Sequence, residues 1–165
     1  MTLRSDPRQD REITLRFVAE PADENLYGKV HGGAVMKWID QAGYACATGW
    51  SGRVCVTVYV GGIRFYKPIL IGHLVEVRAR LIHTGRTSMH IAVDVLSRDL
   101  RTREGHATTH CVIVFVALDT DGNPTEVPAW QPVTEEDKVL ENYATRRLEL
   151  SRSLELERRP YLPEW

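Results

Sequence analysis

The segment from Asn25 to Asp40, NLYGKVHGGAVMKWID, combines a glycine turn, a histidine and a carboxylate at the start of an apolar stretch. At about 100° per residue, the apolar side chains after Gly33 gather on one arc of a helix, and Asp40 falls at the edge of that arc. We expect a carboxylate there to be partly desolvated, as titratable groups in active sites often are. Asp40 is therefore a candidate general base or nucleophile, although a solvated surface aspartate is the simpler interpretation.

The turn before this helix, His31-Gly32-Gly33, offers no Ser, Thr or Asp to cap the first helical turn. Glycines let a ligand approach the free backbone N–H groups closely, and the helix dipole favours negative charge at this end. Such a site suits a carbonyl oxygen that becomes negative during a reaction. The alternative is a plain tight turn in which His31 caps the helix.

These residues resemble the motif of the hotdog-fold acyl-CoA thioesterases, in particular the single-domain bacterial hydrolases similar to the brain-type enzyme. The residues that carry the resemblance are Asn25, Gly28, His31, Gly32, Gly33, Met36 and Asp40. The resemblance extends over about residues 15–118. It implies an α+β hotdog fold, in which a curved antiparallel sheet wraps a long central helix, and a homodimer that commonly assembles into a trimer of dimers, a hexamer.

The same resemblance implies an activity in fatty acid metabolism: hydrolysis of an acyl-CoA to free coenzyme A and a carboxylate, with no metal or redox cofactor. Asp40 corresponds to the carboxylate that activates water or attacks the thioester carbonyl. Asn25 of one chain would face Asp40 of its partner. The N–H of Gly33 would donate to the oxyanion, and His31 would help to shape the turn.

Coenzyme A carries a pyrophosphate and a 3′-phosphate, which arginine binds well through paired hydrogen bonds. The segment Gly85-Arg86-Thr87-Ser88 resembles the hairpin that lines the coenzyme A channel in this family. Gly32, Arg64 and Lys67 are further candidates for binding the substrate. Each of the charged candidates has an ordinary surface charge as its simpler interpretation.

Two other functions fit part of the pattern. A hotdog dehydratase or hydratase acting on 3-hydroxyacyl thioesters would pair His31 with Asp40. A non-catalytic acyl-CoA sensor would bind without turnover, but such regulators generally carry a DNA-binding module, and we find no helix-turn-helix pair. The positions of Asn25 and Asp40 favour hydrolysis over both.

Length and composition are consistent with one domain. The chain has 165 residues, of which 43% are hydrophobic, enough for a sizeable core. Its net charge of −1 provides no general attraction to nucleic acid or an anionic membrane. The polar N-terminus does not resemble a signal peptide, and no segment is apolar enough to span a membrane, so we expect a cytoplasmic protein. Cys46, Cys55 and Cys111 are expected to be reduced core residues.

We assign residues 1–124 to the hotdog domain, with about the first 11 residues loosely held, and 125–165 to a proline-containing linker and a charged helix. Periodicity predicts strands at 13–18, 54–66, 75–81, 89–95 and 111–118, a helix at 33–48 that Gly49 and Gly52 end, a bulge at Gly61-Gly62 and a turn at 84–87.

A capping box at Thr134-Glu135-Glu136-Asp137 predicts the start of the C-terminal helix, which should run to about residue 159. We expect this helix to pack on the oligomer surface or to lie in solvent. Arg146, Arg147 or Arg152 could instead bind coenzyme A phosphates, but the acidic residues between them favour the first interpretation.

Overall fold

A computed structural model describes residues 11–158 and confirms the predicted α+β class. The elements in chain order are β1 (Glu12–Val18), the 3-10 helix η1 (Pro21–Asp23), α1 (Gly32–Ser51), β2 (Val54–Phe65), β3 (Leu74–Thr84), β4 (Ser88–Arg98), β5 (Gly105–Leu118) and α2 (Glu135–Arg158). The prediction of a loosely held N-terminus falls almost entirely on residues 1–10, which lie outside the described residues.

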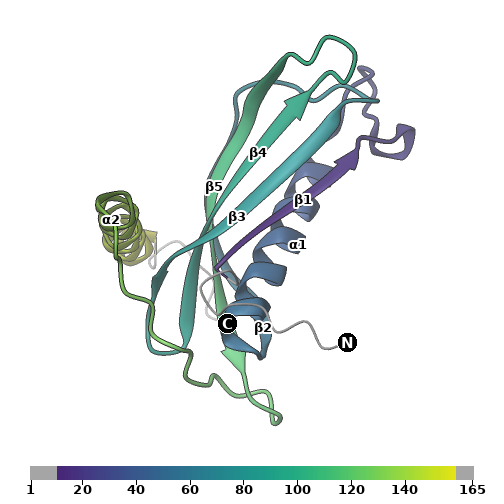
Figure 1. Cartoon of the computed structure of the whole chain (residues 1–165). Helices are drawn as coiled ribbons and strands as arrows, with labels where there is room; N and C mark the ends of the chain where they lie inside the picture. The colour runs from purple at the N-terminus through teal and green to yellow at the C-terminus, as the bar shows by residue number, and fades with distance from the viewer. Residues whose placement is uncertain (1–10, 159–165) are drawn as a thin grey trace.

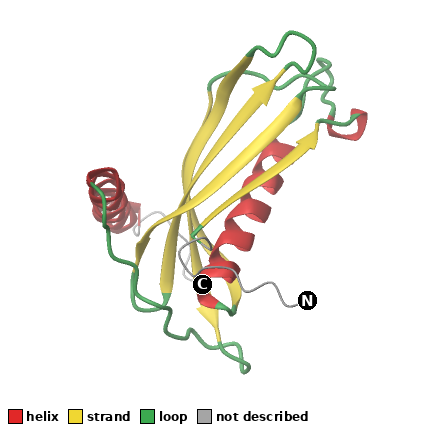
Figure 2. Ribbon diagram, in the orientation of Figure 1, coloured by secondary structure: helices red, strands yellow, loops and turns green. Residues whose placement is uncertain are grey.

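The five strands form one antiparallel sheet in the order β1-β3-β4-β5-β2. The sheet curves around α1, which lies along one of its faces (Figures 1 and 2). This is the predicted hotdog arrangement of a long helix against a curved sheet. Since β2 is the last strand in the order, its outer edge is unpaired within the described chain.

The core lies between α1 and the sheet. Trp38, Ile39 and Ala42 of the helix are buried, and the ring of Trp38 meets that of Phe17 of β1 edge-on at 4.8 Å between centroids. Gly43 lets the helix pack closely on the sheet, because a Cβ atom on it would lie 2.7 Å from Phe115 of β5. The predicted apolar arc therefore faces the sheet.

The helix is longer than the sequence predicts. It ends at Ser51, and Gly52 follows it in the left-handed conformation with φ of 64°. Gly49 lies inside the helix, so its predicted role in ending the helix is wrong. A glycine inside a helix costs only about 1 kcal/mol relative to alanine, so the helix continues through Gly49. It ends where Gly52, three positions later, adopts the left-handed conformation.

The second helix, α2, crosses the opposite face of the sheet (Figures 1 and 2). There Ala144 and Leu140 pack against Ile82, Ala92 and Val112, which form a smaller second core. In the described part of the chain, the sheet thus carries α1, with Asp40, on one face and α2 on the other.

The predicted capping box starts α2. The Thr134 N–H donates to Asp137 Oδ2, and the Asp137 N–H donates to Thr134 Oγ1, both at 3.1 Å. Asp137 is buried and also accepts a hydrogen bond of 2.6 Å from the Arg11 guanidinium. This bond holds the pKa of Asp137 well below its ordinary value of 3.8 and ties α2 to the start of β1.

The three cysteines are free and buried, which agrees with the predicted core positions. Within residues 11–158, neither helix is both long and apolar enough to cross a bilayer. In the same range, no group of three or more His, Cys, Asp or Glu side chains is placed to hold a metal ion.

Candidate active site

Asp40 meets a hydroxyl from the edge strand. Thr57 Oγ1 of β2 donates a hydrogen bond of 2.5 Å to Asp40 Oδ1. Thr57 immediately precedes a bulge, since the register of β2 on β5 shifts between Thr57 and Tyr59. Neither this partner nor this bulge is predicted by the sequence patterns. The one sequence feature that could have indicated this partner is Thr57 itself, the single aliphatic hydroxyl in the valine-rich run 54–60.

The carboxylate is less covered than the sequence predicts. Asp40 is exposed, so the expectation of partial desolvation is wrong for the single chain. The reason is that Asp40 lies on the side of α1 that faces the free edge of β2, where the sheet ends. Met36, one helical turn earlier, is 48% exposed. Within residues 11–158, this side of the helix therefore stays open around Asp40 and Met36.

The first turn of α1 is capped by a side chain, contrary to our first expectation. His31 Nδ1 accepts hydrogen bonds from the N–H groups of Gly33 at 2.9 Å and Ala34 at 3.3 Å. A Cβ atom on Gly33 would lie 2.6 Å from the His31 ring, so this cap needs a glycine. The simpler alternative, His31 as the cap, is what the structure shows. Among the described residues, the Gly32 N–H has no acceptor.

Asn25 lies in a turn that projects from the chain. Its Oδ1 accepts from the N–H groups of Tyr27 at 2.8 Å and Lys29 at 3.2 Å, and Gly28 closes the turn with φ of 72°. The amide NH₂ of Asn25 has no acceptor within residues 11–158, and Tyr27 beside it is 86% exposed. No hydrogen bond joins Asn25 to Asp40 of the same chain, so one chain alone does not bring the predicted pair together.

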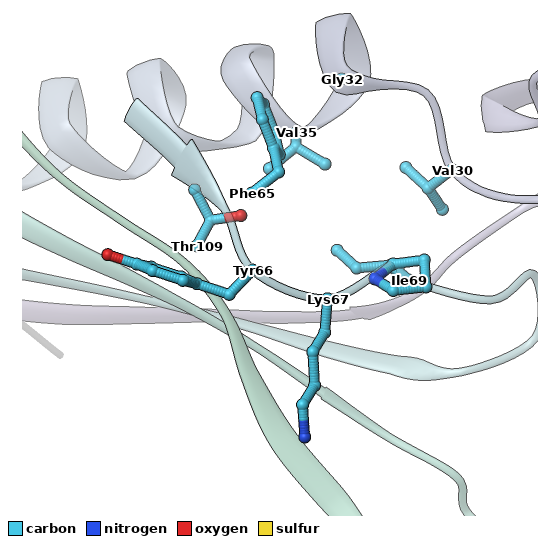
Figure 3. Close-up of a pocket in the computed structure, with 9 residues that line it drawn as sticks. Val30, Gly32, Val35, Phe65, Tyr66, Lys67, Ile69 and Thr109 are labelled. Atoms are coloured by element: carbon cyan, nitrogen blue, oxygen red, sulfur yellow. The ribbon is translucent and has the colours of Figure 1, made fainter. Parts of the chain in front are cut away.

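A cavity of about 320 Å³ lies between the start of α1 and the end of β2 (Figure 3). The Phe65 ring covers Gly32, with 3.4 Å between its edge and a Cβ atom built on that glycine. Lys67 lines the cavity and extends away from the helix, whereas Arg64 is exposed and is not part of its lining. The other lining residues are Val30, Val35, Tyr66, Pro68, Ile69 and Thr109.

The hairpin candidates lie at the other end of the sheet. The Gly85 N–H donates to the Ser88 carbonyl at 2.9 Å, and the Thr87 carbonyl accepts from Ala117 near the end of β5. Arg86, which is exposed, lies 3.7 Å from the Glu126 carboxylate.

The strand register gives the position of the hairpin relative to α1. Ser88 pairs with Val116, close to the first residue of β2, whereas Gly32 contacts Phe65, the last residue of β2. Within one chain, the hairpin residues and the start of α1 therefore do not form one site.

This chain is similar to known proteins along most of its length. Residues 27–104 match the thioesterase superfamily. The chain is 30% identical over 145 residues to protein VdlD of Helicobacter pylori, covering 88% of this chain and 83% of that protein. It is 32% identical over 120 residues to the acyl-CoA thioester hydrolase YciA of Salmonella typhimurium, covering 71% of this chain and 90% of the relative.

Solved structures share the fold along nearly the whole chain. A hexameric acyl-CoA thioesterase has a TM-score of 0.85 at 32% identity, covering 92% of this chain and 97% of that one. An acyl-CoA hydrolase of Staphylococcus aureus, solved with butyryl coenzyme A, has a TM-score of 0.84 at 25% identity, with 93% of each chain covered. Alanine variants of that hydrolase have been characterised at an aspartate and at a threonine 17 positions further on.

Proposed function

Because this chain belongs to the thioesterase superfamily and to its acyl-CoA thioester hydrolases, we propose that it hydrolyses acyl-CoA thioesters to coenzyme A and a carboxylate. The observation that carries the proposal is the position of the Asp40 carboxylate. Asp40 lies on α1, the helix that starts with the glycine turn, and its carboxylate accepts a hydrogen bond from Thr57 of β2. The two residues are 17 positions apart, the same separation as the mutated aspartate and threonine of the Staphylococcus aureus hydrolase.

Asp40 would supply the reacting carboxylate. As a general base it takes a proton from water, the hydroxide adds to the thioester carbon, the carbon–sulfur bond breaks, and the proton passes to the departing thiolate. As a nucleophile its oxygen attacks the thioester carbon, the carbon–sulfur bond breaks and releases the thiolate of coenzyme A, and water then hydrolyses the resulting anhydride to the acid and the Asp40 carboxylate. A single turnover in ¹⁸O-labelled water tests for the anhydride: label in Asp40 would identify the nucleophilic route, because water that attacks the anhydride at the enzyme carbonyl leaves its oxygen on Asp40, whereas the general-base route labels only the acid product.

The start of α1 would stabilise the carbonyl oxygen as it becomes negative. The Gly32 N–H is available, whereas the Gly33 N–H is bonded to His31. The role that the family resemblance gives to Gly33 therefore requires the His31 ring to move when substrate binds. Gly32 and Lys67, which line the adjacent cavity, are proposed to contact the substrate there.

The proposal needs a second copy of the chain. Asn25 is anchored through its oxygen, which leaves its NH₂ group to donate to the partner's carboxylate or to the attacking water. The unpaired edge of β2 is apolar, and an exposed edge of this kind is normally covered. Its exposed valines are Val54, Val56, Val58 and Val60.

We therefore propose a homodimer through β2, with coenzyme A contacts from Arg64, Gly85, Arg86, Thr87 and Ser88 contributed across chains of a larger assembly. Relatives described as hexameric support this. Sedimentation would measure whether the mass is two or six times that of the 18.8 kDa chain. Val56→Arg should reduce both assembly and activity, whereas Val139→Arg on the exposed face of α2 should reduce neither. The proposal includes a cytoplasmic location, which the three free thiols support.

Thiol release from acyl-CoAs between acetyl and palmitoyl tests the reaction. Asp40→Asn should reduce turnover by about 10²–10⁴-fold and Asn25→Ala should also reduce it, whereas Asp121→Asn in an exposed turn should have no effect. Dehydration of a 3-hydroxyacyl thioester without thiol release would support the dehydratase instead. Binding of acyl-CoA with no reaction at all would support the sensor.

A further inference from the structure

The face of the sheet opposite Asp40 contains a second cavity. It has a volume of about 240 Å³ and lies between α2 and strands β2, β4 and β5; we call it the outer groove. Its lining residues are Val58, Tyr59, Ser88, His90, Val112, Val114, Arg147, Leu148, Ser151 and Arg152. On β4, Ser88 and His90 face this groove, whereas Met89 and Ile91 between and beyond them belong to the core under α1.

The lining of the groove combines an apolar wall with two arginines. Val112, Val114 and Leu148 form much of the wall, and Arg147 and Arg152 carry the positive charge. Neither Arg147 nor Arg152 forms an ion pair with a carboxylate of the described residues. Two unpaired guanidinium groups beside an apolar wall favour a ligand that is anionic at one end and apolar elsewhere.

Arg147 is fixed in position but is not saturated. Its Nη1 donates to the Tyr143 hydroxyl at 3.1 Å, and its Nη2 occupies the space where a Cβ atom on Gly61 or Gly62 would lie, at 2.7 and 2.8 Å. The predicted glycine bulge of β2 thus makes room for this guanidinium. The Nε of Arg147 is buried and has no hydrogen-bond partner.

His90 is a second polar group in the lining of the groove. Only 4% of this residue is exposed, yet its ring forms no hydrogen bond with the described residues; it only meets the ring of His83 edge-on at 5.2 Å. Burial, with smaller effects from His83 and Arg152, lowers the pKa of His90 to about 4. At neutral pH the ring is therefore uncharged and offers one N–H donor. Because the ring lines the groove, this N–H group is placed to donate to a ligand that lies there.

We propose that the outer groove binds a carboxylate with an apolar tail, the chemical class of the free fatty acids. The carboxylate would bind to Arg147, Arg152 and the His90 N–H, because Glu155 and Glu157 line the neighbouring groove beyond Ser151 and would repel it there. A cavity of about 150 Å³ can hold benzene, so 240 Å³ accommodates roughly ten carbon atoms. Free fatty acid is also the product of the proposed reaction, but the argument for the groove does not depend on that reaction.

Calorimetric titration of the full-length protein with decanoate tests the proposal. The catalytic site is first saturated with S-decyl-coenzyme A, a thioether that cannot be hydrolysed, and decanoate should still bind. The Arg147→Gln/Arg152→Gln double variant should raise the Kd for decanoate by about tenfold or more. Ser151→Trp, which fills the groove from the helix side, should abolish binding. Arg146→Gln, on an exposed position of the same helix, should leave the Kd unchanged.

Three results would overturn the proposal. Decanol binding as tightly as decanoate would show that the arginines recognise no carboxylate. Loss of decanoate binding when S-decyl-coenzyme A or coenzyme A is present would show that the groove belongs to the substrate channel. An unchanged Kd in both the double variant and Ser151→Trp would place decanoate elsewhere. Because failure of the proposed hydrolysis would appear in thiol release and not in these titrations, the two failures are distinguishable.

Discussion

Replacing Thr57 by valine removes one hydroxyl and keeps the shape of the side chain. That hydroxyl donates to Asp40 at 2.5 Å, the short end of the range for a hydroxyl bonded to a carboxylate. Hydrogen bonds to charged groups contribute about 1.5–3 kcal/mol, which corresponds to a factor of about 10 to 150 in rate. That magnitude applies to the site when substrate excludes water from it. In the single chain both Thr57 and Asp40 are exposed, so water can replace the bond there and the free energy of unfolding should change little.

The assay is steady-state thiol release with the best acyl-CoA of the panel. We expect Thr57→Val to lower kcat by that factor with a small change in KM, because the bond orients the reacting carboxylate and does not hold the substrate. Thr57→Ser keeps the hydroxyl and should restore most of the activity. Thr145→Val removes a hydroxyl from α2 and should leave kcat unchanged. A folded Thr57→Val enzyme with wild-type kcat would refute the assignment of Asp40 and Thr57 as a working pair.

Three further predictions concern stability. Asp137→Asn should lower the free energy of unfolding, measured in urea titrations at pH 7, by about 1.5–3 kcal/mol. Because the bond from Arg11 lowers the pKa of Asp137 from 3.8, this contribution is present above about pH 4 and is lost on further acidification; if the variant were destabilised as much at pH 2 as at pH 7, the prediction would be wrong. The pKa of His90 is about 4 in the folded chain and 6.5 for an unperturbed histidine, so the unfolded chain binds more protons between these values, and stability should fall by at most about 3 kcal/mol from pH 6.5 to 4. His90→Gln should remove this dependence on pH, and an unchanged dependence would assign it to another group. Gly43→Ala places a Cβ atom 2.7 Å from Phe115 and should cost about 1–3 kcal/mol, so a Tm at or above that of the wild type would show that the core can relax at this point.

Local patterns in the sequence predicted most of the elements. The alternating apolar residues around Val77 and Val93 mark strands because one face of each must be buried, and the arc around Ile39 marks a helix for the same reason. The capping residues Thr134 and Asp137 act on neighbours three positions away, so the start of α2 was also predictable.

Other features depended on contacts between distant segments. Thr57 reaches Asp40 because a bulge in β2 sets the register of that strand on β5, and the unpaired run of valines alone could not show where that bulge falls. The partial desolvation expected for Asp40 failed because the sheet order ends at β2, and no local pattern gives the order of strands.

The sequence by itself determined the class of fold and the start of both helices within a residue or two, because each depends on side chains within one helical turn or one strand. It also determined the residues that resemble a thioesterase site, because that resemblance rests on residue types and their spacing along the chain. Only the tertiary structure decided how those residues meet. It bonds His31 to Gly33, holds Asp40 with Thr57, and separates the hairpin at Arg86 from the start of α1 by the length of the sheet. These outcomes follow from strand order and register, which are fixed by packing among residues far apart in the chain.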